Sequence, residues 1–300
     1  MFLINPYTFV TASGDNDFKI TVDTTVTAGG SASDTFILPL QNGATNMTVY
    51  WGDGNSDVIT TYNQAELTHV YASSGTYQIS LDGSFSGIRF GGGGDRLKLS
   101  SIDNWGTNQW GTMQFAFYLC SNMVGTYTDS PDTSLVADMY GAFRGCSSFN
   151  SPLTFDCSNV TTMAFMFFGC SSFNSDVTFT NTSNVLSMNA MFRTATVFNK
   201  PLNFDTSNVT DMTNMLRTTA FDQDISSFNI SSLTSATQML DASAFSTTNY
   251  DLLLVAWQGQ THNNSVNFHA GTAQYSSGAP ATARAGLITD LWTITDGGPV

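Results

Sequence analysis

The feature that most constrains this chain is a ten-residue phrase that recurs along it, as SNVTTMAFMF, SNVLSMNAMF and SNVTDMTNML. A methionine in each phrase serves as a reference position, and the same phase extends to six positions: Met113, Met139, Met163, Met188, Met212 and Ala236. Successive reference positions lie 24 to 26 residues apart, and apolar residues recur four residues and nine or ten residues after each one. Such a fixed period is typical of stacked repeats, in which each unit buries its apolar side against its neighbours.

Each repeat predicts one short strand and one short helical segment. Leu202 and Phe204 alternate with the polar Asn203, as inward and outward residues alternate along a strand. In SNVTDMTNML the apolar residues are spaced three and four apart, which predicts an α- or 3₁₀-helical segment of about two turns. We therefore expect a solenoid of about six coils between about Leu97 and Trp257.

Three of the four cysteines, Cys120, Cys146 and Cys170, share one phase of the repeat. A shared phase places them above one another inside the stack, where a buried cysteine behaves as a small apolar residue. This predicts a ladder of free thiols, and a disulfide between neighbouring coils is the alternative. No CxxC pair is present, so a zinc site is not expected.

The two ends of the chain differ from the repeats. Short alternating segments between residues 16 and 88, separated by turn residues, predict a β-sandwich. A run of four glycines, Gly91 to Gly94, precedes DRLKL, which we interpret as a strand, and marks the junction with the repeats. After the repeats, Tyr250 to Gln260 predicts an amphipathic helix, followed by a strand, a helix that starts near Pro280, and a closing strand. The expected division is 1–15 N-terminal arm, 16–88 sandwich, 89–258 solenoid and 259–300 C-terminal cap.

Composition excludes several classes of function. Charged residues make up only 11%, and 23 acidic residues against 9 basic ones give a net charge of −14. An acidic protein repels phosphates, so binding to nucleic acid is not expected. No apolar run is long enough for membrane insertion, and the start, MFLINPYTFVTASGDN, lacks the basic region of a secretory signal.

Two resemblances add to this interpretation. VYWGDG, followed by HVYASSGTYQISLDG, resembles a PKD-type immunoglobulin-like sandwich; the matching residues are Trp51, Gly52, Asp53, Gly54, His69, Tyr71, Gly75 and Tyr77. The repeats and the tail ending in WTITDGG resemble BspA-like leucine-rich repeat surface proteins, and LKLSSIDNWG at the join resembles their phage-encoded type. The expected fold class is therefore mainly β with short helices: an immunoglobulin-like (PKD-type) β-sandwich, then a leucine-rich-repeat-like solenoid of about six 24–26-residue coils, then a C-terminal cap.

The sequence contains little that predicts catalysis. His69 belongs to the sandwich motif and is expected to be structural, and His262 and His269 lie in the expected cap. Asp53 and Asp57 could bind Ca²⁺ with backbone oxygens, but a turn-stabilising Asp53 is the preferred interpretation. No catalytic residue, metal or cofactor is expected, and a glycan hydrolase is the weakest of the alternatives.

Binding is the favoured function. Outward residues on the predicted strands form a polar ladder of hydroxyl, amide and carboxylate groups that could hydrogen-bond a sugar or a protein strand. The candidate residues are Thr154, Asp156, Thr178, Thr180, Asn203 and Asp205. The alternative is that they are ordinary solvated edge residues.

The resemblance to phage-type members implies a non-enzymatic virion surface protein, tail-fibre-like or head-decorating, that attaches to a host. Its expected partners are virion structural proteins of the capsid or tail, and a polysaccharide or protein of the host surface. A bacterial cell-surface adhesin and a purely structural capsid or tail cement protein are the alternatives. The sequence leaves open the ligand, the oligomeric state, the copy number and whether the head or the tail carries the protein.

Overall fold

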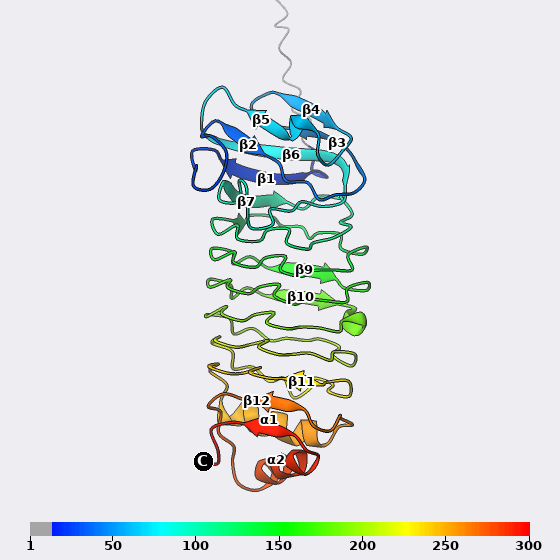
Figure 1. The fold of residues 1–300 in the computed structure, drawn as a ribbon, viewed down its shortest axis with the longest axis vertical. Helices are drawn as coiled ribbons and strands as arrows, with labels where there is room; N and C mark the ends of the chain where they lie inside the picture. Colours follow the sequence, from blue (N-terminus) through cyan, green and yellow to red (C-terminus); the bar gives the residue numbers. More distant parts are fainter. Residues whose placement is uncertain (1–13) are drawn as a thin grey trace, which may run out of the picture.

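The structure is a computed structural model that describes residues 14–300. It is an elongated column, with an N-terminal pair of sheets at one end, stacked turns of chain in the middle and two helices at the other end (Figure 1). The expected N-terminal arm, residues 1–15, lies outside the described residues except for its last two. Most of the start MFLINPYTFVTASGDN, which lacks the basic region of a secretory signal, also lies outside the described residues.

The N-terminal end is built on a six-stranded sheet with the order β4-β3-β6-β1-β7-β8. Its strands are β1 (Phe18–Asp23), β3 (Thr45–Tyr50), β4 (Ser56–Ile59), β6 (Thr76–Phe85), β7 (Leu99–Asn104) and β8 (Val124–Gly125). A second, two-stranded sheet pairs β2 (Thr35–Ile37) with β5 (Thr68–Val70), which follows the 3₁₀ turn η1 (Ala65–Leu67). Alternation determines the buried face: Phe18, Ile20 and Val22 of β1 are completely buried.

The large sheet continues from the N-terminal end into the repeats. β7, which the sequence assigned to the first coil, pairs antiparallel with β1, and β8 then pairs parallel with β7. The interpretation of DRLKL as a strand is wrong for residues 95–98, which form turns before β7 begins. The domain boundaries expected at residues 88 and 258 stay predictions. The six-stranded sheet extends across residue 88, because β7 and β8 belong to the same sheet as β1 and β6.

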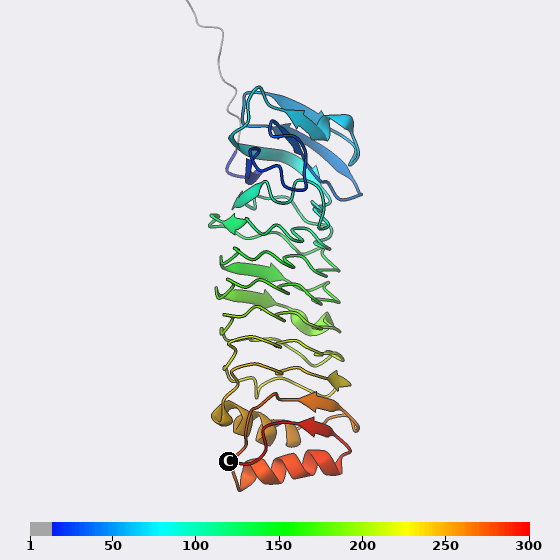
Figure 2. The same ribbon diagram turned by 60° about the vertical axis from the view of Figure 1, so that its left-hand side comes forward.

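In the middle of the column, successive repeats lie one above another as rungs (Figure 2). In each rung, the seven residues that begin at the reference position form one segment of a wall that we call the turn wall. Residues 163–169 are one such segment. Its alternate amides donate to the next rung: Met163 N to Ser187 O (3.0 Å), Phe165 N to Asn189 O (2.8 Å) and Phe167 N to Met191 O (2.8 Å). The same pattern repeats from Met113 to Thr218, so the period of the sequence is the period of these bonds.

The opposite side of each rung, which we call the strand wall, contains residues 153–156, 177–180 and 202–205. Only two of these segments are regular strands, β9 (Leu153–Asp156) and β10 (Val177–Thr180), which pair in parallel. The strand expected at Leu202–Phe204 does not form, and Pro201 beside it has no N–H to donate.

The expected leucine-rich-repeat-like solenoid is wrong. The strands of the described repeats are short pieces in separate sheets, β9 with β10 and β11 (Ser235–Ala236) with two strands of the cap, and no sheet closes around the repeats. The helical segments are also absent: in the described rungs the only helical element is the three-residue η2 (Thr182–Asn184). What remains correct is a protein that is mainly β with few helices.

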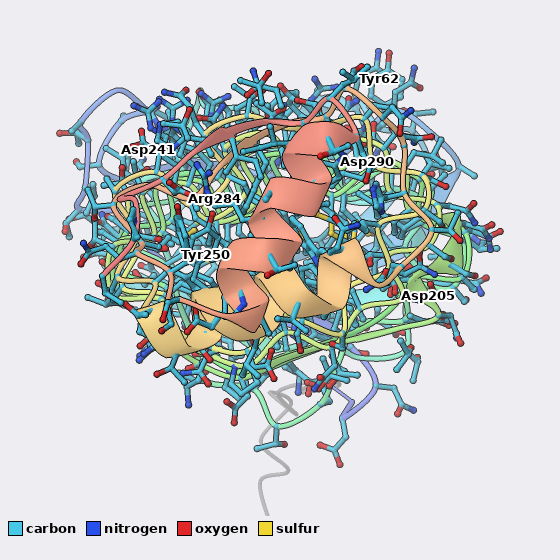
Figure 3. The ribbon with its side chains drawn as sticks, turned by 90° about the horizontal axis from the view of Figure 1, so that it is seen from below. Tyr62, Asp205, Asp241, Tyr250, Arg284 and Asp290 are labelled. Atoms are coloured by element: carbon cyan, nitrogen blue, oxygen red, sulfur yellow. The ribbon has the colours of Figure 1, made fainter. Side chains whose placement is uncertain are left out.

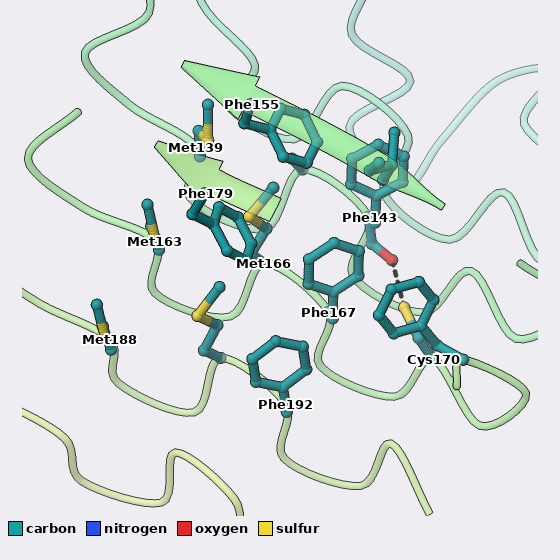
Figure 4. Close-up of a cluster of buried hydrophobic side chains, with 14 of the residues drawn as sticks. Met139, Phe143, Phe155, Met163, Met166, Phe167, Cys170, Phe179, Met188 and Phe192 are labelled. Carbon is teal, nitrogen blue, oxygen red and sulfur yellow. Dashed lines mark hydrogen bonds between the residues drawn. The ribbon is translucent and has the colours of Figure 1, made fainter. Parts of the chain in front are cut away.

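The core between the two walls consists of ladders of apolar side chains, many of them identical from rung to rung (Figure 4). Phe143, Phe167 and Phe192 stack with ring centroids 5.4 Å apart. The three in-phase cysteines are buried and free, which confirms the predicted thiol ladder. Two of the thiols donate between rungs: Cys146 Sγ to Phe117 O and Cys170 Sγ to Phe143 O, both at 3.0 Å. The in-phase apolar residues are therefore core, as the period predicts.

The C-terminal cap closes the far end of the column, where α1 and α2 lie across the last rung (Figure 3). Its elements are α1 (Thr247–Gln258), β12 (Asn267–His269), α2 (Ala279–Thr289) and β13 (Thr293–Thr295), which confirms the predicted order of helix, strand, helix and strand. Ser246 Oγ caps α1 by accepting from Asn249 N. Asp296 holds the end together, because it accepts from Arg284 Nε (2.6 Å) and from Tyr250 Oη (2.7 Å). None of the helices in residues 14–300 is long and apolar enough to cross a bilayer.

Candidate functional site

Three of the six sequence-predicted binding residues form an exposed row on the strand wall. Thr154 of β9 lies opposite Thr178 of β10 in the parallel register, and both are exposed. Asn203 continues the row: it is exposed and lies next to Phe204, whose ring is 5.2 Å from that of Phe179 in the rung above. Within the described residues, none of these three side chains makes a hydrogen bond to the protein. Their donors and acceptors therefore face solvent.

The other three predicted residues, Asp156, Thr180 and Asp205, hold the ends of the strand wall in place. Asp156 Oδ1 accepts from Asn181 Nδ2 and from Ser158 N, both at 3.0 Å, and these bonds lower the pKa of the carboxyl group. Hydrogen bonds from Ser207 lower the pKa of Asp205 in the same way. Thr180 Oγ1 donates to Phe155 O (3.2 Å). These side chains are structural first, because their polar atoms already have partners.

A cleft opens at the N-terminal end of the strand wall. One hollow of about 210 Å³ is lined by Tyr127, Thr128, Asp129, Ser130, Pro152, Leu153 and Thr154. An adjoining hollow of about 490 Å³ shares Thr128 and Asp129 and is lined also by Asp15, Lys19, Gln78, Asp103 and Asn104. Of the predicted binding residues, Thr154 lines this cleft.

Two carboxylates of this cleft, those of Asp103 and Asp129, accept hydrogen bonds from neighbouring groups of the protein. Asp129 accepts from the backbone amides of Trp105 and Gly106 at 2.8 to 3.0 Å. Burial opposes ionisation of Asp103, but hydrogen bonds from Ser101, Thr21, Gln78 and Thr126 outweigh it and lower the pKa. In the part of the chain that the structure describes, no group of three or more His, Cys, Asp or Glu residues is arranged to hold a metal ion.

The three histidines, and the motif residues at the N-terminal end, make contacts within the protein that give them structural roles. His69 stacks on Trp51 (4.7 Å between ring centroids) and its Nε2 lies 2.9 Å from Asp53 Oδ2. Asp53 also accepts from Asn55 N at 3.0 Å, which confirms its predicted role in the turn. In the cap, His262 lies 3.2 Å from Asp290, and His269 Nδ1 accepts from Gly271 N.

The outward surface of the turn wall carries a cluster that the sequence analysis missed. Five half-buried rings, which we call the aromatic row, follow one another across three rungs: Tyr118, Phe115, Tyr140, Phe165 and Phe168. Each ring contacts the next, with centroids 5.2 to 5.8 Å apart. The ring of Phe115 lies directly over Gly141, where a Cβ atom would come within 3.0 Å of it.

Three arginines lie on the aromatic row. Arg144 is central: its guanidinium lies 5.1 Å from the Tyr118 ring, 5.3 Å from Phe165 and 4.9 Å from Phe168. Arg89 lies over Phe115 and Arg193 over Phe168. We call the aromatic row with these arginines the aromatic–arginine face. The missed signal was positional, since most of these residues recur at fixed distances from the reference methionines: Phe115 and Phe165 two residues after, and Tyr118, Arg144, Phe168 and Arg193 five residues after.

The comparisons with known proteins place the repeats in one family. A family model described as "Mycoplasma protein of unknown function, DUF285" matches residues 89–178, 111–204 and 172–276, which overlap and together cover more than half of the chain. No curated protein and no solved structure shows significant similarity to the chain.

Proposed function

Because the chain belongs to the DUF285 family of BspA-like repeat proteins, we propose that it is a non-enzymatic attachment protein that recognises a host surface polymer through its repeats. In this proposal the protein is carried on a virion surface, as a tail-fibre-like or head-decorating component, and its further partners are capsid or tail proteins. Residues 16–88 are its PKD-type domain and serve as an attachment or spacer module.

The observation that carries the proposal is the row of Thr154, Thr178 and Asn203. These side chains are exposed, repeat at the spacing of the rungs, and make no hydrogen bond within the described residues. Neighbouring strands in a sheet lie roughly 4.8 Å apart. A regular array of free hydroxyl and amide groups at that spacing suits an extended ligand, because each rung can repeat the contact made by the last.

A second candidate is a bacterial cell-surface adhesin. The description of the matching family as a Mycoplasma protein favours this candidate, because it names a bacterial source. Recognition through the strand wall is common to both candidates; they differ in where the protein is displayed.

Location is tested first. Particles purified from the source are analysed by quantitative mass spectrometry against the major capsid protein. A reproducible copy number is expected, and a few copies would indicate the tail whereas hundreds would indicate the head. Complete absence from the particles, with the protein recovered from the bacterial surface instead, would replace the virion proposal with the adhesin.

Recognition is tested separately with the variant T154A/T178A/N203A of the full chain. Binding to host cells should fall by about tenfold, equivalent to about 1.4 kcal/mol, because three free hydrogen-bonding groups are lost. The matched control is S148A/S172A, which removes exposed hydroxyls from two successive rungs beside Phe149 and Phe173. Equal binding by both variants would exclude the strand wall as the recognition surface.

A further inference from the structure

We propose that the aromatic–arginine face is a second binding surface, and that it takes an anionic polysaccharide whose sugar rings lie on the aromatic row while its carboxylates pair with the arginines. This goes beyond the proposed function, because the face lies on the turn wall and uses different side chains. Phe143 of the turn wall and Phe155 of the strand wall meet in the core, 6.3 Å apart. Their outward neighbours therefore point to opposite sides of the column.

The charge of the face is the first observation. The chain has nine lysines and arginines and a net charge of −14, yet three of those nine residues gather here. Among residues 14–300, Lys98, Lys200, Arg217 and Arg284 each lie within ion-pair distance of an aspartate. Five basic residues do not, and three of these five, Arg89, Arg144 and Arg193, lie on this face; the other two are Lys19 and Arg96. A guanidinium without a carboxylate partner can bind one from a ligand, in a bidentate geometry that matches its planar fork.

The continuity of the rings is the second observation. Aromatic residues and arginines are the side chains most enriched where binding energy concentrates. The aromatic row is only half-buried, and the arginines lie on it rather than between it and an acidic side chain. A ligand that contacts this face must therefore offer both an apolar surface for the rings and negative charge for the guanidinium groups.

Neighbouring aspartates narrow the class of ligand. Asp138 and Asp211 border the turn wall, one residue before Met139 and Met212, and their carboxylates are held by Gln114 and Asn189. These charges, together with the acidity of the whole chain, repel polyanions in general, so a ligand must gain affinity from the rings as well as from the arginines. An acidic peptide supplies carboxylates but no repeated ring surface. An acidic polysaccharide supplies both at a regular interval, which suits a row of stacked rungs.

The experiment uses the full chain and four immobilised polymers: polygalacturonate, neutral dextran, polyglutamate and oligo(dT). We expect polygalacturonate to bind, with an affinity that falls as salt screens the arginines. Dextran should not bind measurably, and polyglutamate and oligo(dT) should bind at least about tenfold more weakly, because charge alone is not sufficient. Equal or tighter binding of polyglutamate or oligo(dT), or no binding of polygalacturonate, would overturn the proposal.

Variants then locate the site. Arg144→Gln should weaken binding to polygalacturonate by about tenfold. Arg217→Gln is the matched control: Arg217 lies five residues after its reference methionine, as Arg144 does, but its Nε is 3.0 Å from Asp241, so its loss should change affinity by less than about twofold. Arg144→Lys keeps the charge without the planar stacking and should fall between the two.

Circular dichroism and thermal unfolding of each variant show whether the column remains folded. If Arg144→Gln does not fold, Arg193→Gln replaces it, since that side chain lies at the end of the aromatic row. Retention of full affinity by a folded Arg144→Gln or Arg193→Gln variant would contradict the assignment. These results do not depend on where the protein is displayed, so the particle measurement can fail while this one succeeds.

Discussion

Two residues in every rung have a left-handed backbone, two and six residues after the reference position. In the second rung both are glycines, Gly141 and Gly145, but in later rungs they include Ala190, Asn214 and Thr218, with φ between 52° and 59°. The conformation recurs because it aims alternate amides at the next rung, where Thr218 N reaches Asp241 O at 2.9 Å. Most of these residues accept a conformation that costs a non-glycine side chain about 1–2 kcal/mol.

Thr218→Gly should therefore stabilise the protein. The gain is expected to be about 0.5–1 kcal/mol, because release of the left-handed strain exceeds the extra freedom of glycine in the unfolded chain. Urea unfolding followed by circular dichroism measures it. Thr178→Gly, in the regular strand β10, is the control and should destabilise instead. A loss of similar size in both variants would show that the left-handed residues are not strained.

At the scale of elements, the sequence predicts the direction of side chains better than the path of the backbone. The strands β9 and β10 and the four elements of the cap are predicted because their alternation, spacing and capping residues are local signals. The helical segment is not, since a spacing of three and four also fits successive turns. In the structure Met166 N bonds to Met163 O, as in a tight turn, and Phe165 with φ 59° interrupts any helix.

The candidate binding surfaces also differ in how far the sequence predicts them. Alternation along a strand indicates that Thr154 and Thr178 point outward, so the strand wall could be predicted from sequence. Outward rings such as Phe165 could not, because their apolar character suggests burial and the left-handed backbone at Phe115 and Phe165 is not evident from the sequence. The unpaired state of Arg144 is also a tertiary property, since its ring neighbours come from the two rungs on either side of its own.

One link between elements was also hidden from the sequence. Lys98, just before β7, is 1% exposed, and its Nζ contacts the carbonyl oxygens of Ser31, Ala32 and Thr35 at 2.6 to 3.1 Å. Its neighbour Asp95 accepts from the amides of Ser31 and Ile37. The segment between the glycine run and β7 is thereby fixed to β2 and to the loop that leads into it.

Lys98→Met should reduce the free energy of unfolding by about 3–5 kcal/mol, because it leaves Asp95 and several carbonyl oxygens buried without their cation. Chemical denaturation measures this loss. Lys200→Met is the control, since Lys200 pairs with an aspartate that is 79% exposed, and its loss should change stability by less than about 1 kcal/mol. Similar losses in the two variants would mean that the buried pair does not hold the loop.

At the scale of the whole molecule, the column is a stack of rungs in which equivalent positions make equivalent contacts. Each turn wall presents the same amides downward and the same carbonyls upward, and each core position meets its counterpart, as Phe173 meets Phe198 with centroids 5.8 Å apart. Contacts are made chiefly between neighbouring rungs. The stability of such an array is approximately a sum of contributions from the rungs and their interfaces. After a deletion, stability should therefore depend more on whether the remaining rungs stay in phase than on how many residues are removed.

Deletion of residues 188–211 tests this. The deletion removes one rung and joins Ser187 to Met212, so Leu216 takes the place of Phe192 beneath Phe167 and every later ladder stays in phase. The variant should fold cooperatively, with a smaller dependence of unfolding free energy on urea because less surface is buried. Deletion of residues 200–211 removes half as many residues but places inward side chains outward, and it should unfold the rungs below. A more stable fold after the shorter deletion would contradict the importance of phase.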